Sequence, residues 1–143
     1  RRFDFKLKND RIVFLSDYAH HPAEIRQSVQ SIRMLYPGRK ITVVFQPHLY
    51  TRTRDFYHEF ADSLSLSDEV ILLDIYPARE KPIEGVSSRL IYDNLRPGIE
   101  KRLCHKEELL DVLRNKQSDI LITLGAGDID NYVPQIYEML KDK

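Results

Sequence analysis

The run KITVVFQP, residues 40–47, decides the fold class because its apolar residues follow one another without polar alternation. A strand covered on both faces has such a continuous, β-branched pattern, whereas a strand with one solvent-facing side alternates. Two further runs share the pattern, EVILLDIYP at residues 69–77 and SDILITLG at residues 118–125. Three such strands predict a mainly parallel sheet in the middle of an α/β domain.

Segments with helical spacing of apolar residues separate these strands. The first predicted helix, residues 22–36, begins with a proline and is followed by Pro37-Gly38. Its apolar face is predicted to consist of Ile25, Val29, Ile32 and Leu35 or Met34. The second, residues 54–66, is predicted to bury Phe56, Phe60, Ala61 and Leu64. Further helices are predicted at residues 87–95, 106–116 and 128–143.

The beginning of the chain has a different pattern. Residues 1–8 alternate between apolar and polar side chains, and a second strand-like segment, residues 11–18, follows after Asn9-Asp10. Because Asn-Asp suits a turn, these segments predict an antiparallel hairpin. With a weaker strand at residues 98–104, the sequence predicts a Rossmann-like, three-layer α/β domain. Its mainly parallel sheet has about six strands, the first of them antiparallel.

Composition and charge restrict the classes of function. Lys+Arg and Asp+Glu both number 22, so the formal net charge is zero and no nucleic-acid surface is predicted. No apolar run reaches the roughly 20 residues of a membrane span. A single cysteine, Cys104, fits a reducing compartment, so we expect a cytoplasmic protein. The chain opens with RRFD, without an initiator Met, and we therefore expect a domain of a longer protein.

Ligands of parallel α/β sheets bind at the carboxyl ends of the strands, and the first such loop here is DYAHHP. Asp17 can accept a hydrogen bond from a ribose hydroxyl or orient a histidine. His20 can bind an anion or hold a proton near neutral pH. Alternatively, Asp17 is a turn residue and His21 a helix N-cap. From these residues alone, both interpretations stay open.

The second loop, FQPHLYTRTRDF, carries Arg52 and Arg54 just before or at the start of a helix. Cations there oppose the helix macrodipole, so they predict an anionic ligand such as a carboxylate or phosphate. His48 adds another polar group to the same loop. The alternative is a solvated basic loop whose arginines pair with Asp55 or Glu59.

The remaining loops specify less. YPAREKPIEG predicts an ordered loop, and the glycine-rich TLGAGDID predicts a tight turn with Asp128 as the N-cap of a helix. Neither G-x-G-x-x-G nor G-x-x-x-x-G-K-[ST] occurs, so the sequence has no recognisable phosphate cradle. Cys104 and His105 lack partners at metal-ligand spacing, so we predict structural roles for both and no metal site.

Taken together, DYAHHPAEI, FQPHLYTRTRDF, YPAREKPIEGV and LGAGDI resemble the C-terminal domain of the Mur ligase family, over essentially the whole chain. The double histidine, Q-P-H-x-Y-T-R-T and G-A-G-D-I resemble in particular its alanine-adding branch. The resemblance implies that residues 1–143 follow an N-terminal UDP-sugar domain and a central ATPase domain. It also implies that ATP, with Mg2+, activates UDP-N-acetylmuramate as an acyl phosphate, which L-alanine attacks during peptidoglycan synthesis.

The same resemblance implies roles for individual residues. Tyr18, His20 and His48 line the L-alanine site, Arg52 holds the L-alanine carboxylate, and Asp17 faces the ATP side. His20 is the candidate proton acceptor, although no general base is assigned. ATP and Mg2+ are bound mainly by the central domain, so the isolated domain is expected to be inactive.

Two positions depart from the family pattern. The family more often has Q-P-H-R-Y-T-R-T where this chain has Leu49, which puts a clamp of two arginines in doubt and leaves Arg52 more of the contact. Ser16 replaces a first acidic residue, while Asp17 is retained. Two alternatives remain: the C-terminal domain of the related murein-peptide ligase, and a non-catalytic α/β module that binds small anions.

Overall fold

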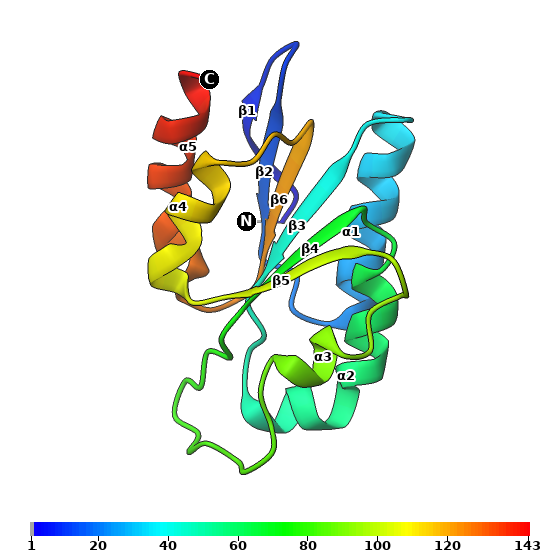
Figure 1. Ribbon diagram of the computed structural model, residues 1–143, viewed down its shortest axis with the longest axis vertical. Helices are drawn as coiled ribbons and strands as arrows, with labels where there is room; N and C mark the ends of the chain where they lie inside the picture. Colours follow the sequence, from blue (N-terminus) through cyan, green and yellow to red (C-terminus); the bar gives the residue numbers. More distant parts are fainter. Residues whose placement is uncertain (1) are drawn as a thin grey trace.

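The computed structural model describes residues 2–143 and consists of one six-stranded sheet between two layers of helices (Figure 1). The strands are β1 (Asp4–Lys8), β2 (Val13–Asp17), β3 (Ile41–Phe45), β4 (Glu69–Leu73), β5 (Glu100–Cys104) and β6 (Ile120–Leu124). They lie in the order β1-β2-β6-β3-β4-β5, and every pairing except β1 with β2 is parallel. The predicted fold class and the antiparallel first strand are therefore confirmed.

Within residues 2–143, five α-helices and two short 3-10 segments accompany these strands. The helices are α1 (Pro22–Leu35), α2 (Tyr50–Leu64), α3 (Arg89–Tyr92), α4 (Leu109–Arg114) and α5 (Val133–Lys141), with η1 (Lys106–Glu108) and η2 (Asp128–Tyr132) before the last two. In Figure 1, α1, α2 and α3 cover one face of the sheet and α4 and α5 the other. Within residues 2–143, no helix combines the length and the apolar character needed to cross a membrane.

The central strands build a separate core with each helical layer. Every residue of β3, β4 and β6 is buried, as their continuous apolar sequences predict. Successive side chains point to opposite faces of a strand. Phe45 accordingly packs in one core with Ile25 and Phe60, while its neighbour Val44 packs in the other with Ile136. Apolar burial on both faces holds the strand ends in place.

Two predicted apolar faces are partly wrong. Phe56 is 46% exposed, because its non-helical backbone (φ −129°, ψ 16°) kinks α2 and takes this residue out of the buried row. At the end of α1, Leu35 and Met34 are also exposed. There Tyr36, the residue after the helix, packs against the core instead.

Helix α2 begins earlier than its sequence predicts, at Tyr50 rather than residue 54. The backbone N–H and the hydroxyl of Thr53 both donate to the carbonyl oxygen of Leu49, at 3.2 and 2.9 Å. Leu49 precedes the helix with a φ of 76°, in the left-handed region that costs energy for a residue with a Cβ atom. The earlier start places Arg52 inside the first turn.

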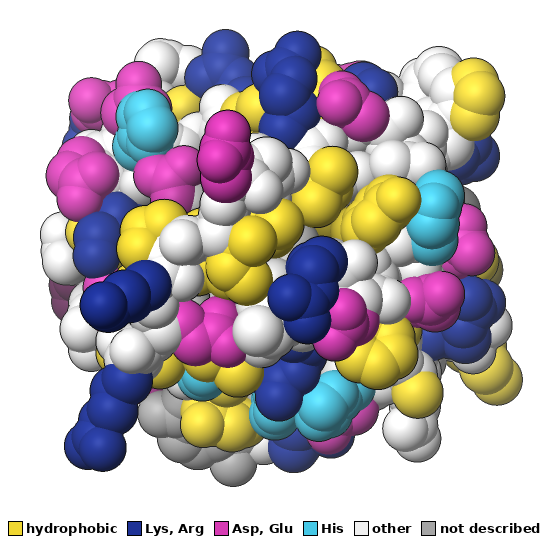
Figure 2. Space-filling model, turned by 90° about the horizontal axis from the view of Figure 1, so that it is seen from below, with side chains coloured by type: hydrophobic (Ala, Val, Ile, Leu, Met, Phe, Trp, Pro, Cys, Tyr) yellow, Lys and Arg dark blue, Asp and Glu magenta, His cyan; other side chains and the backbone are white. Residues whose placement is uncertain are grey.

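The carboxyl ends of β2, β6 and β3 form the junction at which connections leave in opposite directions. The chain passes from β2 and β3 to α1 and α2 on one face, and from β6 to α5 on the other. In parallel sheets such a junction opens the crevice in which ligands bind. Seen from below, the molecule shows histidine side chains beside Lys or Arg side chains (Figure 2).

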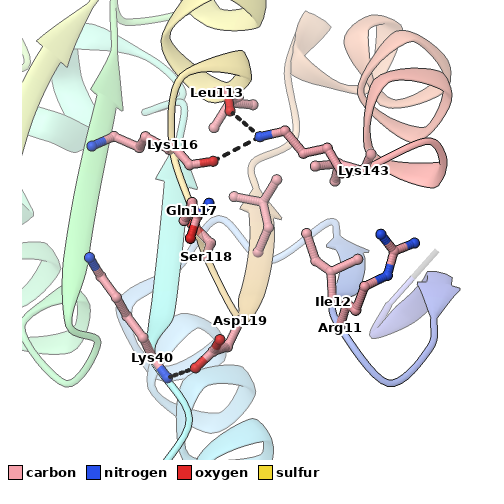
Figure 3. A pocket seen from close by; sticks show the side chains of 11 residues that line it. Arg11, Ile12, Lys40, Leu113, Lys116, Gln117, Ser118, Asp119 and Lys143 are labelled. Atoms are coloured by element: carbon pink, nitrogen blue, oxygen red, sulfur yellow. Dashed lines mark hydrogen bonds between the residues drawn. The ribbon is translucent and has the colours of Figure 1, made fainter.

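The opposite, amino end of the sheet contains a cavity of about 630 Å³ between the strand starts, α4 and α5 (Figure 3). Two of its lysines, Lys40 and Lys116, pair with the buried carboxylate of Glu69. A third, Lys143, donates to the backbone oxygens of Leu113 and Lys116, at 3.3 and 2.8 Å. The lysines of this cavity are therefore engaged by the protein itself.

Candidate functional site

Asp17 ends β2, and its side chain is fully buried. One carboxylate oxygen accepts hydrogen bonds from the backbone N–H of Ala19 at 3.0 Å and from Nε of Arg2 at 2.5 Å. The other accepts a hydrogen bond from the hydroxyl of Ser28 in α1. A buried carboxylate needs such partners. Asp17 therefore joins the strand end, the turn and α1, as its interpretation as a turn residue predicts.

The two adjacent histidines begin α1, with His21 as its N-cap. The Glu24 carboxylate accepts hydrogen bonds from the backbone N–H groups of His20 and His21, both at 3.1 Å. Because these bonds satisfy donors that a helix leaves free at its start, they fix the backbone of both histidines. The His20 ring lies 5.5 Å from the Tyr18 ring, centre to centre, and its Nδ1 is 3.1 Å from the Tyr18 carbonyl oxygen.

His48 follows β3 and is held by the loop that follows β4. A parallel bridge joins His48 to Tyr76, with the Leu49 N–H donating to the Tyr76 carbonyl at 2.9 Å and the Tyr76 N–H to the Pro47 carbonyl at 2.8 Å. The His48 ring consequently lies 5.6 Å from the Tyr76 ring and 6.1 Å from the His20 ring. The loops after β2, β3 and β4 thus meet at one place.

Arg52, in the first turn of α2, is partly buried and has no hydrogen bond or ion pair with any of residues 2–143. Its charge acts on the neighbouring histidines. Burial first, and then Arg52, lower the pKa of His48; burial, His20 and Arg52 lower the pKa of His21. Both rings are consequently neutral near pH 7. Arg52 remains as the cation of this histidine cluster.

The Nδ1 atom of His48 is buried and has no hydrogen-bond partner within residues 2–143. Buried polar atoms without a partner are uncommon in folded proteins, and each asks for an explanation. A guanidinium next to an unsatisfied imidazole nitrogen can receive an anion that also exchanges a hydrogen bond. The structure thus brings together Tyr18, His20, His48 and Arg52, all four of the residues assigned to the amino-acid site.

Glu80 lies next to this cluster, and no motif in the sequence indicates that it belongs to the site. The Glu80 carboxylate accepts hydrogen bonds from the N–H groups of Tyr50 and Thr51, at 2.6 and 3.1 Å, and from the Thr51 hydroxyl at 2.5 Å. Only an indirect signal was available: Leu49, the residue before α2, has no side-chain acceptor, so the capping group had to come from elsewhere.

Arg54 behaves differently from Arg52. Its guanidinium is exposed and pairs with the adjacent Asp55, with 2.9 Å between Nε and Oδ1. This pairing agrees with the alternative interpretation, in which an arginine of this loop is solvated and pairs with Asp55. The two arginines of the T-R-T-R motif are therefore distinct, and only Arg52 faces the histidines of the cluster.

The glycine-rich loop after β6 forms a packed turn. A Cβ atom on Gly127 would lie 2.4 Å from Oε1 of Gln46 and 2.7 Å from Cγ of Tyr76. The predicted N-cap is wrong, because Gly127 occupies that position in η2. Asp128 instead accepts hydrogen bonds from Gln46 at 2.6 Å and Lys106 at 2.5 Å. The side chains of Gln46 and Tyr76 therefore pack directly against this turn and require a glycine at position 127.

Cys104 and His105 lie away from the histidine cluster, at the end of β5. Burial raises the pKa of the Cys104 thiol to about 11, and the exposed His105 pairs with Asp74 at 2.6 Å. Among residues 2–143, His20, His21 and Glu24 form the group whose ligand atoms lie close enough, within 4.8 Å, to suggest a metal site. The Glu24 carboxylate is already committed to backbone amides and Arg2, so we assign the group no metal.

Comparison with known proteins agrees with this architecture. A UDP-N-acetylmuramate–L-alanine ligase of Phocaeicola vulgatus is 73% identical over 143 residues, all of this chain and 31% of that protein. The crystal structure of a UDP-N-acetylmuramate–alanine ligase from Thermotoga maritima has a TM-score of 0.78 at 28% identity, covering 99% of this chain and 30% of its own. The chain thus spans about a third of the length of the curated relatives it matches.

A more distant structure shares the fold alone. A murein peptide ligase from Psychrobacter arcticus has a TM-score of 0.77 at 15% identity, covering all of this chain and 30% of its own. The family model described as "Mur ligase, glutamate ligase domain" matches residues 1–127. Because that match covers most of the 143 residues, the chain belongs to the Mur ligase family, in its glutamate ligase domain.

Proposed function

We propose that this chain is the amino-acid-binding, C-terminal domain of a three-domain, ATP-dependent ligase that joins L-alanine to UDP-N-acetylmuramate in peptidoglycan synthesis. The observation that carries the proposal is the unpaired Arg52 beside the unsatisfied Nδ1 of His48. A relative named for this reaction is 73% identical, whereas the likeness to the murein peptide ligase, at 15% identity, supports only the fold.

In the proposed site, Arg52 receives the carboxylate of L-alanine in a two-pronged, charge-assisted hydrogen bond. Tyr18 and His20 lie along the loop after β2 and line the other side, and the His48 ring lies behind them with its buried Nδ1 unsatisfied. The amine of L-alanine must lose a proton before it attacks. A histidine of this cluster can accept that proton, with His20 as the candidate. Positioning is the main contribution of these residues to the reaction.

ATP would activate the lactyl carboxylate of UDP-N-acetylmuramate as an acyl phosphate. The amine nitrogen of L-alanine would then bond to the carbonyl carbon as phosphate leaves. The sequence of this chain has no phosphate-loop motif, and its glycine-rich turn packs against Gln46 and Tyr76. We therefore assign ATP and Mg2+ mainly to a central domain, and expect no ligase activity from this domain alone. Since ATP is its co-substrate, we place the enzyme in the cytoplasm.

Asp17 is proposed to face the nucleotide when the domains close. Its carboxylate is buried, and Arg2, with 44% of its side chain exposed, is the partner nearest to solvent. A ribose hydroxyl would therefore replace Arg2 rather than Ala19 or Ser28 as a donor to this carboxylate.

The full-length parent protein tests the proposal. Purified enzyme is incubated with ATP, Mg2+ and UDP-N-acetylmuramate, and ADP release is measured with L-alanine or with murein tripeptide in competition. We expect turnover with L-alanine and little with tripeptide. Preference for the tripeptide would make the chain part of a murein-peptide ligase, and the absence of turnover with either would favour a small-anion-binding module.

A further inference from the structure

We propose that Glu80 is a positioning and specificity-determining residue of the amino-acid site, which restricts the site to amino acids with a single carboxylate. The inference rests on the proposed function. It begins from the three hydrogen bonds by which Glu80, in the loop between β4 and α3, closes the first turn of α2, the turn that carries Arg52.

The start of α2 requires an anion that its own sequence does not provide. A helix leaves its first N–H groups without partners and carries partial positive charge at this end. Leu49 cannot cap them, the first turn has no acidic residue, and Arg52 adds a full positive charge. Glu80 supplies the missing acceptor, and its hydrogen bond from the Thr51 hydroxyl keeps the pKa of the carboxyl below its usual value.

The loop is folded so that Glu80 reaches this helix. The Glu80 N–H donates to the Pro77 carbonyl at 2.9 Å, across a turn in which Ala78 has a φ of 54°. Tyr76, one residue before that turn, is bridged to His48. Glu80 is thus tied to the same strand end as His48, so the helix start, Arg52 and His48 keep a fixed relation to one another.

This arrangement limits what the site can bind. With the first N–H groups of α2 already occupied, Arg52 is the group left to receive the substrate carboxylate. A second carboxylate, on an acidic side chain, would meet the negative charge of Glu80 instead of free N–H groups. The geometry therefore favours a small amino acid with an uncharged side chain and disfavours aspartate or glutamate.

Steady-state kinetics of the full-length ligase test this inference. We compare wild type with Glu80→Gln, which keeps the shape but removes the charge, and with Glu84→Gln as the matched control. Glu84 lies in the same loop, is exposed, and has no hydrogen bond or ion pair with any of residues 2–143. For each protein, kcat and KM are measured with L-alanine, L-aspartate and L-glutamate, and thermal unfolding verifies the fold.

For Glu80→Gln we expect KM for L-alanine to rise about tenfold, as the loss of a charge-assisted hydrogen bond would cause, with kcat changed much less. Discrimination against the acidic amino acids should fall by about the same factor, while Glu84→Gln behaves as wild type. Unchanged KM and selectivity would overturn the inference, as would lower stability with selectivity intact. If wild type does not use L-alanine, the proposed function itself fails.

Discussion

The two ends of the sheet use their positive charges in different ways. At the amino end, the cavity of about 630 Å³ is lined by lysines, of which Lys40 and Lys116 pair with the buried Glu69. At the carboxyl end, Arg52 has no partner among residues 2–143 and lies beside a histidine with a buried, unsatisfied nitrogen. The amino end contains the cavity, but its lysines are already engaged by the protein itself. The carboxyl end contains polar groups that have no partner within residues 2–143.

This difference separates charges that hold the fold from charges that await a ligand. A carboxylate buried among lysines is costly unless its partners stay in place, so the amino end should govern stability. An unpaired guanidinium contributes little to folding, but it can form a strong pair when a carboxylate arrives. Substitutions at the two ends should therefore affect different measurements.

The largest effect should follow Arg52→Ala in the full-length ligase. Loss of a two-pronged contact with the substrate carboxylate should raise KM for L-alanine by up to about a hundredfold, near 2.7 kcal/mol. Because Arg52 has no partner in the described chain, the melting temperature should change little. Arg54→Ala, at the exposed arginine paired with Asp55, is the control and should leave KM unchanged. A change confined to KM for ATP would refute the carboxylate assignment.

Glu69→Gln should lower the free energy of unfolding and leave KM unchanged, the reverse of Arg52→Ala. Only 3% of Glu69 is exposed, and its loss would leave Lys40 and Lys116 without their shared anion at the start of β4. We expect unfolding to become easier by about 2 kcal/mol, with KM for L-alanine unaffected. Urea denaturation of the 143-residue chain measures this change. The control is Glu100→Gln, at a side chain 61% exposed, which should cost below about 0.5 kcal/mol. Equal midpoints for the two variants would contradict a stabilising role for the buried Glu69 pairs.

Much of the fold could be predicted because its signals are local. The runs that form β3, β4 and β6 are apolar throughout, and burial on both faces is what such runs require. Phe56 has helical spacing as well, yet it is exposed, because a kink in α2 depends on the surroundings of the helix rather than on its periodicity. Periodicity identified the elements, while packing determined their ends and irregularities.

The candidate site likewise has parts that could be predicted from the sequence and parts that could not. The loops after β2 and β3 could be predicted to share one edge of the sheet, because parallel strands end at the same edge. Glu80 could not, because it reaches α2 from 30 residues away along an irregular loop. Asp128 was misassigned for the same reason: its partners Gln46 and Lys106 are remote in sequence and more favourable than the predicted cap.

A smaller effect is expected at Leu49, which occupies the position of a frequent family arginine. Leu49→Arg would place a second guanidinium next to His48 and make the carboxyl end more cationic. KM for L-alanine should fall about threefold, the gain of a partly solvated charge contact. Leu49→Lys, which adds the charge without the planar fork, should have a weaker effect. If neither variant lowers KM, the backbone at this position, with its φ of 76°, directs the side chain away from the ligand.

The smallest effect should appear in the pH dependence of stability. The carboxyl end of the sheet should affect it at acid pH and the amino end at alkaline pH. Burial lowers the pKa of His48 in the folded protein. Below about pH 6.5 the unfolded chain therefore binds a proton at this histidine more readily than the folded chain, and stability falls. Above that pH the stability contribution of neutral His48 is complete. The hydrogen bond to Glu100 raises the pKa of Lys40, so its contribution is present below about pH 10.5 and is lost as pH rises through the higher folded value. In urea midpoints across pH, His48→Gln should flatten only the acid limb and Lys40→Gln only the alkaline limb. A variant that altered the limb belonging to the other end would show that the two charge clusters are coupled through the sheet.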